Sequence, residues 1–217
     1  MPPAGKWRFA GATKSARHLH FAKAPFKVLF MPEGLNDEAT ELLNATQFDA
    51  TLRRLAWQIL EHHPERKLAF VGIRRRGVPL AARMKSLVAE RSPDVALGEV
   101  DITFHRDDPD NIEAMLQLGR SRVDIPDLDE RCVILFDDVI YTGRTIRAAI
   151  DDLLDFGRPA KIELAVVVDR GHRELPIQPD YVGLSHRTGP GEYIRVSLQE
   201  EDGRDGVYLH QTKRTPA

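Results

Sequence analysis

Two adjacent carboxylates, Asp137 and Asp138, end an apolar run in the stretch VILFDDVIYTGRT (residues 133–145). An ionised carboxylate that leaves water costs free energy unless an opposite charge or hydrogen-bond donors face it. Two kinds of partner suit such a pair: a divalent cation, or the vicinal hydroxyls of a ribose. The pair therefore indicates a binding site; the alternative is that Asp138 only caps a turn and Thr145 only caps the next helix.

The residues after this pair form a candidate anion site. Thr142, Gly143, Arg144 and Thr145 lie between a predicted strand and a predicted helix, where unpaired backbone N–H groups and the helix dipole favour a phosphate. Gly143 lets the backbone approach closely, the threonine hydroxyls donate hydrogen bonds, and Arg144 adds positive charge. The stretch lacks the lysine of the GxxxxGK[ST] loop of nucleotide triphosphatases. Phosphate on one side and a diol on the other describe a ribose-5-phosphate site.

Alternating strands and helices are predicted to position these residues. The start of 133–145 reads as a buried strand, and TIRAAIDDLLDFG (145–157) reads as an amphipathic helix with Gly157 at its C′ position. KIELAVVVD (161–169) is the next predicted strand. This spacing predicts a right-handed βαβ unit in a parallel sheet, and such sheets bind ligands at the carboxyl ends of their strands.

The upstream part of the chain continues the pattern. Thr46 and Asp49 have the spacing of a capping box at the start of a helix. KLAFVGI (67–73) and ALGEVDITF (96–104) are predicted strands, and Pro79 suits the first turn of a helix between them.

Three candidate site segments follow predicted strand ends: Arg74–Gly77, Asp137–Thr145 and Asp169–Arg173. Residues 105–126 form a long, charged connection without periodicity, which in a compact domain is typical of a functional or disordered loop.

The stretch 133–145 resembles the thirteen-residue signature for phosphoribosyl pyrophosphate (PRPP) of type I phosphoribosyltransferases. The resemblance implies an α/β fold: a mostly parallel twisted sheet flanked by helices, with a flexible active-site loop and a small base-binding hood. It implies that Asp137 and Asp138 are catalytic and hold the ribose hydroxyls, with Mg²⁺ bound through PRPP. GIRRRG (72–77) resembles the pyrophosphate loop of the family; a solvated basic turn is the alternative. The implied PRPP contacts are Arg75, Arg76, Gly77, Asp137, Asp138, Val139, Ile140, Tyr141, Thr142, Gly143, Arg144 and Thr145.

A larger resemblance, over roughly residues 45–209, is to the PyrR family. It rests on DITFHRDD (101–108), on the stretch 137–183 with its string DRGHRELP, and on the DG-V-Y ending. The family implies a uracil phosphoribosyltransferase, a pentosyltransferase that converts uracil and PRPP to UMP and pyrophosphate. Tyr141 stands where hypoxanthine–guanine enzymes have an acid, which argues against a 6-oxopurine substrate.

The same resemblance implies further site residues. Arg170 and Ile194 are implied for the base pocket. Arg106 is implied as a catalytic pyrophosphate contact in a loop over 105–122 that closes on the site; a solvent-exposed loop arginine is an equal alternative. LSHR (184–187) departs from the family pattern, so the detail of the base-side loop is open.

Members of this family can also regulate pyrimidine operons by attenuation. The second hypothesis is therefore a UMP- or UTP-sensing protein that binds the mRNA leader with weak or no catalysis. Arg53 and Arg54 are the RNA-binding candidates, with the solvated face of an amphipathic helix as the alternative, and Trp57 stands where we expect a histidine. The net charge of −2 provides no general basic field, so RNA binding requires a local basic face.

The length of 217 residues suits one domain with terminal additions. We expect a basic, flexible extension over 1–40, a phosphoribosyltransferase domain over 41–210 and a tail over 211–217. No acidic residue precedes Glu33; this suits an arm that contacts RNA, a transit peptide, or an unselective tail upstream of a start at Met31.

The single cysteine, Cys132, lies in an apolar run. It excludes a disulfide framework and fits a reducing cytosol. No apolar run reaches the roughly 18–20 residues of a membrane span. We expect a cytoplasmic protein without a membrane partner, and the resemblance implies a homodimer or a higher homo-oligomer.

Overall fold

The structure, a computed structural model, describes residues 39–64, 66–102 and 121–212. All of them belong to the larger of the chain's two units, Gly34–Ala217. The expected basic extension, Arg106 with most of its loop, and the last residues of the tail lie outside the described part of the chain. The domain bounds expected from the sequence therefore stay predictions.

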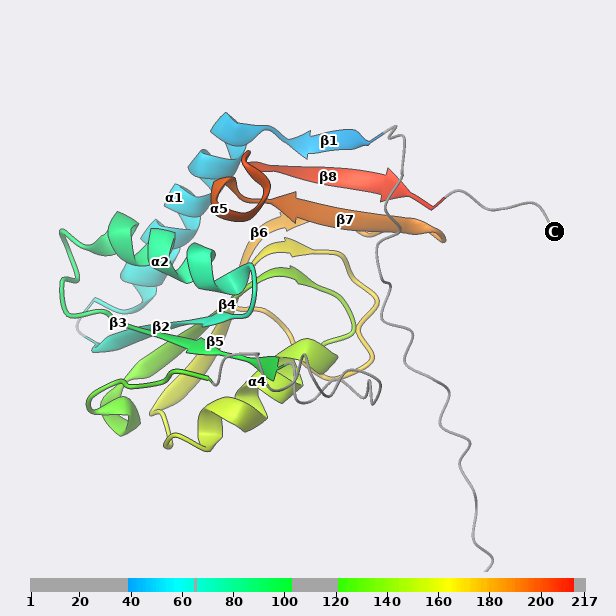
Figure 1. Cartoon of the computed structure of the whole chain (residues 1–217). Coiled ribbons are helices and arrows are strands. Elements are labelled where there is room, and N and C mark those ends of the chain that lie inside the picture. The colour runs from blue at the N-terminus through cyan, green and yellow to red at the C-terminus, as the bar shows by residue number, and fades with distance from the viewer. Residues whose placement is uncertain (1–38, 65, 103–120, 213–217) are drawn as a thin grey trace, which may run out of the picture. The chain divides into compact units, whose positions relative to one another are not determined.

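A parallel sheet with the strand order β3-β2-β4-β5-β6 carries the candidate site (Figure 1). Its strands are rich in branched apolar residues, and such runs suit a parallel sheet that is buried on both faces. Helices do cover both faces, so the predicted α/β architecture is confirmed. The strands are β2 (Leu68–Ile73), β3 (Ala96–Val100), β4 (Cys132–Ile140), β5 (Lys161–Asp169) and β6 (Tyr181–Ser185).

Two strands differ from their predicted bounds. β3 ends at Val100 rather than continuing through residue 104. β4 does not end before the carboxylates, because Asp137 pairs with Val166 of β5 and the pairing continues to Ile140. The two carboxylates are therefore held by a regular ladder, which fixes their direction more firmly than a loop would.

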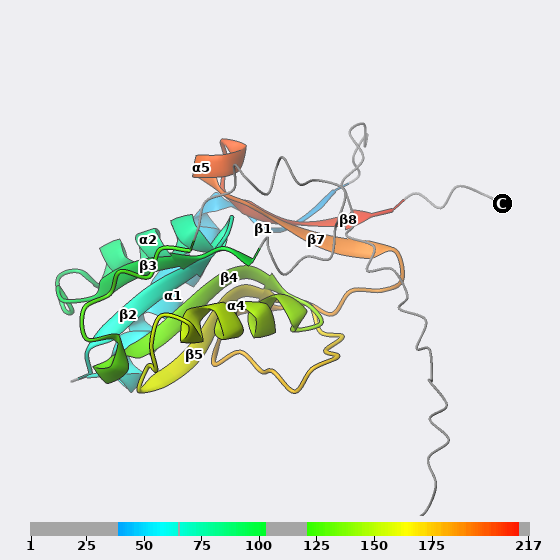
Figure 2. The same cartoon turned by 60° about the horizontal axis from the view of Figure 1, so that its bottom comes forward.

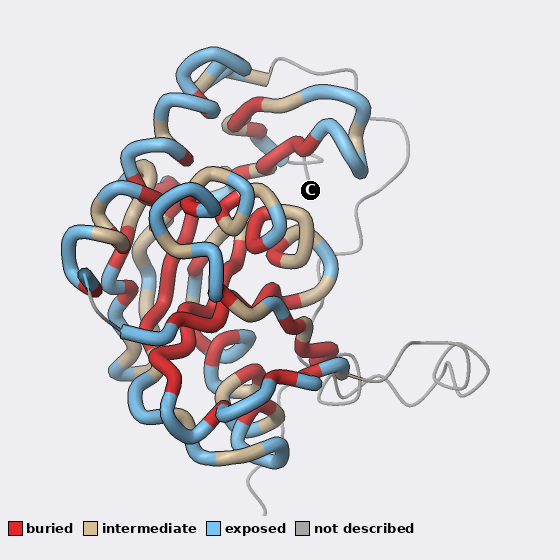
Figure 3. Tube along the Cα trace, turned by 90° about the vertical axis from the view of Figure 1, so that its left-hand side faces the viewer, coloured by how far each residue is buried: buried red, intermediate tan, exposed pale blue. Residues whose placement is uncertain are grey.

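The helices cover the sheet on two sides (Figures 1 and 2). α1 (Ala45–His62) and α2 (Gly77–Val88) lie on one side, and α4 (Arg144–Leu154) lies on the other. Neighbouring residues of a strand point to opposite faces, so Ile134 packs with the α1 and α2 side and Leu135 packs with the α4 side. Figure 3 shows the buried residues concentrated along the central strands.

The start of α1 differs from the prediction. The N-cap is Asn44, whose side chain accepts a hydrogen bond from Gln47 N while Gln47 Oε1 accepts one from Asn44 N, each at 3.0 Å. The predicted box of Thr46 and Asp49 is wrong by two residues. Asn is among the best N-cap residues, and the amide of Gln47 completes the reciprocal pair.

The end of α4 also differs. The helix ends at Leu154 with Asp155 as its C-cap, so Gly157 is not the C′ residue. A Cβ at Gly157 would come within 2.9 Å of Asp129 Oδ1, which accepts a hydrogen bond from Arg158 N. Glycine is needed there for close approach to a neighbouring segment rather than for helix termination.

A small antiparallel sheet, ordered β1-β8-β7, is the expected hood. It joins the first described strand to the last two, so the beginning and the end of the domain pair with each other (Figure 1). The short helix α5 lies between its last two strands. Its elements are β1 (Thr40–Leu43), β7 (Glu192–Ser197), α5 (Gln199–Asp202) and β8 (Gly206–Gln211).

No helix among the described residues is both long enough and apolar enough to span a membrane.

Candidate active site

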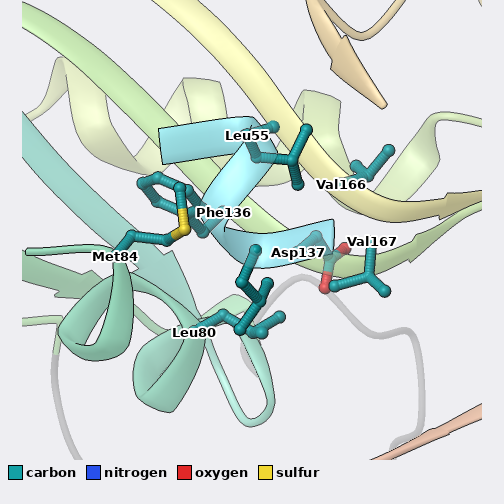
Figure 4. A pocket seen from close by; sticks show the side chains of 9 residues that line it. Leu55, Leu80, Met84, Phe136, Asp137, Val166 and Val167 are labelled. Atoms are coloured by element: carbon teal, nitrogen blue, oxygen red, sulfur yellow. The ribbon is translucent and has the colours of Figure 1, made fainter. Parts of the chain in front are cut away.

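The two carboxylates occupy the carboxyl-terminal part of β4 in different surroundings. Asp137 is only 8% exposed, and its carboxylate lies beside Val167 in an apolar pocket that Leu80 also lines (Figure 4). Its Oδ1 accepts a hydrogen bond from Asp138 N at 2.9 Å. The Asp138 side chain is 24% exposed and accepts a bond from Val139 N at 2.8 Å. Asp138 is therefore the more accessible carboxylate of the pair.

Burial raises the pKa of Asp138 above its ordinary value. The Arg76 guanidinium, whose Nε lies 4.0 Å from Asp138 Oδ2, opposes this shift, as does the backbone N–H of Val139. These groups compensate the burial only in part. Asp138 therefore carries a charge that a ligand hydroxyl or a cation would stabilise further.

The predicted anion loop has the expected form. Gly143 adopts φ 91°, which favours glycine, and α4 begins with the next residue, Arg144. The first turn of α4 contains no acidic residue, so its backbone N–H groups face an environment suited to an anion. Thr142 Oγ1 accepts a bond from Arg144 N at 3.4 Å.

The string DRGHRELP braces this loop from the next strand end. Arg173 donates to the carbonyl of Tyr141 at 2.8 Å and to the Asp169 carboxylate at 2.6 Å. The backbone N–H of Glu174 donates to the carbonyl of Thr142 at 3.0 Å. Sequence analysis placed Arg173 in the candidate segment Asp169–Arg173 but assigned no bracing contact to Arg173 or Glu174, because bonds to backbone carbonyls leave no pattern in the sequence.

The Glu174 carboxylate also accepts hydrogen bonds from Arg144 at 2.8 and 3.0 Å. Both side chains are about half exposed, and an exposed pair of this kind contributes little to stability. Little free energy is therefore lost if the Arg144 side chain leaves Glu174 and turns toward a bound phosphate.

The three arginines of GIRRRG have three different environments. Arg74 donates to Glu99 at 2.8 Å and to Asp101 at 3.1 Å, so it ties the end of β2 to β3. Arg75 is exposed, and its side chain makes no hydrogen bond or ion pair with another described residue. Arg76 lies near Asp138. The structure therefore brings Arg76 to the carboxylates, leaves Arg75 open to solvent, and uses Arg74 within the fold.

Gly77 sets how closely this basic loop approaches β4. A Cβ at Gly77 would lie 2.1 Å from the carbonyl oxygen of Phe136, the residue before the carboxylates. Only glycine fits at that contact, and it is the residue that starts α2. The predicted PRPP contact at Gly77 is thus also a packing requirement of the site.

Asp202, at the end of α5, is a site residue that sequence reasoning missed. It accepts bonds from Arg76 Nη2 at 3.2 Å, from Arg195 Nη2 at 2.7 Å and from Leu198 N at 3.0 Å. Arg76 is thereby held between Asp138 and the hood. The sequence has only an acidic run before a glycine here, which is a common surface pattern. Asp202 lies more than a hundred residues from Arg76 along the chain, so their contact leaves no pattern in the sequence.

Of the two base-side candidates, Arg170 lies beside Tyr141. The Arg170 guanidinium stacks over the Tyr141 ring at 4.1 Å and donates to Thr188 Oγ1 at 2.9 Å. Burial lowers the pKa of Arg170 from its ordinary value. Ile194 on β7 is 9% exposed and belongs to the core cluster of the α1 and α2 side. Arg170 and the hood are linked directly, because Arg170 Nη2 also donates to the carbonyl of Glu192 at 3.2 Å.

The two RNA-binding candidates on α1 differ. Arg53 pairs with Asp49 at 2.7 Å, and its side chain is 60% exposed. Arg54 Nη2 donates to the carbonyls of Gly183 at 2.6 Å and Val182 at 3.3 Å. Both residues are exposed, but Arg54 satisfies carbonyl groups of β6, whereas Arg53 pairs with a neighbour on its own helix.

Comparisons with known proteins agree with this geometry. The family described as "Phosphoribosyl transferase domain" matches residues 38–201. "Bifunctional protein PyrR 1" of Lactiplantibacillus plantarum is 44% identical over 176 residues, which cover 80% of this chain and 98% of that protein. The chain belongs to the PyrR family of phosphoribosyltransferases. Another PyrR relative, "Bifunctional protein PyrR" of Thermus aquaticus, is 46% identical over 171 residues, 78% of this chain and 94% of its own.

Solved structures of other phosphoribosyltransferases have the same fold as this chain. A hypoxanthine-guanine phosphoribosyltransferase from Bacillus anthracis matches with a TM-score of 0.56 and 17% identity. The match covers 81% of this chain and 100% of that enzyme's chain. The hypoxanthine phosphoribosyltransferase of Trypanosoma cruzi in complex with the product IMP matches with a TM-score of 0.60 and 12% identity, covering 84% of this chain and 95% of its own. At these identities the likeness establishes the fold.

Proposed function

We propose that this protein transfers the phosphoribosyl group of PRPP to N1 of uracil and releases UMP and pyrophosphate. One observation carries the proposal: the carboxylates of β4 lie between an anion loop, braced by DRGHRELP, and a loop that brings Arg76 within 4.0 Å of Asp138. A diol site between two anion sites matches the chemistry of PRPP, which carries a 5-phosphate, two ring hydroxyls and a pyrophosphate. Membership of the PyrR family selects uracil as the base.

The proposed mechanism assigns the protein mainly to positioning and charge stabilisation. Asp137 and Asp138 accept hydrogen bonds from the ribose hydroxyls and offset the positive charge that builds on the ring as the C1–O bond loosens. The loop Thr142–Thr145 holds the 5-phosphate. Arg75 and Arg76 hold the departing pyrophosphate, for which the planar guanidinium is well suited. Each well-aimed group of this kind contributes about 2.7–4 kcal/mol.

The residues present fit a role for Mg²⁺. Carboxylate oxygens are the ligands that Mg²⁺ prefers, together with substrate phosphate oxygens and water. The raised pKa of Asp138 shows that its negative charge is incompletely compensated. We propose that Asp137 and Asp138 hold Mg²⁺ together with PRPP, where the ion would neutralise the charge that develops on pyrophosphate.

The uracil site is proposed beside Tyr141 and Arg170, under the hood. Tyr141 has no carboxylate that could exchange a proton with a purine ring, in keeping with a pyrimidine. Arg170 is fixed by Thr188 and Glu192, so its direction is set before the base binds, and Ile194 provides an apolar wall.

We further propose a second activity, because the relatives carry the name "Bifunctional protein". That activity is UMP- or UTP-dependent binding of a pyrimidine-operon mRNA leader, with Arg53 as the better placed of the two α1 candidates. A leader transcript titrated at two salt concentrations tests it: salt-sensitive binding that UMP or UTP strengthens is expected, and binding that ignores both nucleotides would reject it.

Conversion of uracil to UMP by the full chain tests the primary proposal. UMP formation should require PRPP and Mg²⁺ together and should release one pyrophosphate for each UMP. Tight PRPP binding without any UMP would leave a nucleotide-sensing protein as the better description.

A further inference from the structure

A compact group of side chains that could bind a metal lies at the amino-terminal ends of the parallel strands, whereas the proposed PRPP site lies at their carboxyl ends. His63 is the C-cap of α1, Cys132 is the first residue of β4, and Glu163 is on β5. Cys132 and Asp137 are five residues apart on one strand, a separation of roughly 16 Å at the rise of a parallel strand. The group is therefore distinct from the PRPP site.

The three side chains converge in a buried place. Their exposed fractions are 6% for His63, 1% for Cys132 and 5% for Glu163. His63 Nε2 lies 2.8 Å from Glu163 Oε2 and 4.0 Å from Cys132 Sγ. The nitrogen, sulfur and carboxylate oxygen all lie within 4.8 Å of one another.

These distances suit a tetrahedral zinc ion. Zinc binds sulfur at about 2.3 Å and nitrogen or oxygen at about 2.0–2.2 Å, which sets neighbouring ligand atoms roughly 3.3–3.7 Å apart. The observed 2.8 and 4.0 Å lie on either side of that range, so small rotations of the side chains are enough. A mixed set of sulfur, nitrogen and oxygen donors favours Zn²⁺ over Mg²⁺ or Ca²⁺, which prefer oxygen alone.

We propose that His63, Cys132 and Glu163 form a zinc site, with the fourth position beside the Tyr181 hydroxyl. That hydroxyl donates to Glu163 Oε2 at 2.8 Å and lies 3.3 Å from His63 Nε2, so it borders the same space. The site joins the end of α1 to β4 and β5, and bound zinc would hold these three elements together.

A purely structural hydrogen-bond network is the competing explanation. In the metal-free protein Glu163 accepts bonds from His63, Tyr181 and Lys161. However, this network gives the Cys132 sulfur only a long contact of 4.0 Å to His63 Nε2, whereas a zinc ion would bind the sulfur directly. Lys161 is 51% exposed, so it can leave the carboxylate for water when a cation arrives.

Zinc binding would change the protons of the group in a defined way. Burial, followed by the charge of Glu163, raises the pKa of the Cys132 thiol to about 11, so this thiol keeps its proton without metal. Coordination would form the Zn–S bond and release that proton to water. Nε2 of His63 would bind the metal through its lone pair, so the neutral imidazole would carry its proton on Nδ1.

Cobalt provides a specific readout, because the whole chain contains one cysteine. We would remove metals from the full-length protein with a chelator and titrate it with Co²⁺ alone. A thiolate-to-cobalt charge-transfer band that saturates at one ion per chain is expected, and stoichiometric Zn²⁺ should abolish it. No such band in excess Co²⁺ would overturn the proposal.

Variants separate this site from the PRPP site. Cys132→Ser, a near-isosteric change, should lose the band and the rise in melting temperature that Zn²⁺ gives the wild type, while UMP formation stays within about twofold. Asp137→Asn with Asp138→Asn should keep the band. If Cys132→Ser does not fold, Glu163→Gln serves instead, with at least a tenfold loss of Co²⁺ affinity expected; unchanged affinity there would contradict the proposed ligand set.

Discussion

Two adjacent carboxylates, Asp137 and Asp138, are the residues on which the proposed chemistry depends. Asp137 is buried against apolar side chains, and Asp138 is accessible with a raised pKa. Carboxylates whose pKa is perturbed by burial are found preferentially at functional sites.

The double change Asp137→Asn with Asp138→Asn is expected to abolish UMP formation, with a loss of at least about 10²–10³-fold. The amide groups keep the size of the side chains but lose the negative charge that offsets charge on the ribose ring. Steady-state rates and circular dichroism measured together check this expectation. Normal turnover by the folded variant would remove the ribose site from β4.

The change Asp138→Asn alone is expected to leave the protein at least as stable as the wild type at neutral pH. The raised pKa means that the folded protein binds the Asp138 proton more tightly than the unfolded chain does. Its stabilising effect is present at pH below the ordinary pKa of Asp and is lost as pH rises through the raised value. As pH rises from the ordinary pKa of Asp to the raised value, the melting temperature of the wild type should fall relative to that of the variant. If the two melting temperatures change in parallel across the pH series, the assigned pKa shift is contradicted.

At the scale of elements, the site exists because strand ends and loops from distant parts of the chain meet. β4 supplies the carboxylates, the start of α4 supplies the anion site, and the loop after β5 braces it through Arg173. The hood contributes through Asp202, which holds Arg76. Hood and sheet are therefore linked at Arg76, the proposed pyrophosphate contact.

The change Asp202→Asn is expected to lower kcat/KM for PRPP by about tenfold, since a hydrogen bond to a charged group contributes about 1.5–3 kcal/mol. The expected effect is on PRPP and pyrophosphate rather than on uracil, because Arg76 faces Asp138. Kinetics with each substrate varied in turn measure it. Glu201→Gln changes the exposed neighbouring residue and is the matched control. Asp202→Glu keeps the negative charge and should lower kcat/KM less than Asp202→Asn does. An equal effect on both substrates would indicate a general loss of structure.

The sequence predicts the elements well and the contacts between them less well. The buried strands and the βαβ unit follow from apolar runs, and β5 has the predicted bounds, Lys161–Asp169. The N-cap of α1 was misplaced, because Asn44 and Gln47 form a better reciprocal pair than Thr46 and Asp49. Asp202 and the His63 group could not be found, since each depends on residues far apart in the chain whose types alone are unremarkable.

At the scale of the whole molecule, one domain accounts for the proposed catalysis. The family match begins at residue 38 and the first strand at Thr40, so residues 1–30 precede every element of the site. We propose a homodimer or higher homo-oligomer, and size-exclusion chromatography with light scattering checks it.

Deletion of residues 1–30 is expected to leave UMP formation within about twofold of the full chain. The reason is that every described candidate contact lies between Arg75 and Ile194 on elements of the matched domain. Rates of both proteins, measured at equal concentration with melting temperatures as the control for folding, test this. A large loss of rate with unchanged folding would assign the basic segment to the active site or to the assembly.

We propose above that the β4 site transfers phosphoribose to uracil. The most direct test supplies the full-length protein with PRPP, Mg²⁺ and an equimolar mixture of uracil, hypoxanthine, guanine and orotate, and identifies every nucleotide that forms. We expect UMP to be the dominant product. IMP, GMP or orotidylate as the main product, or no nucleotide at all while PRPP binds, would contradict it.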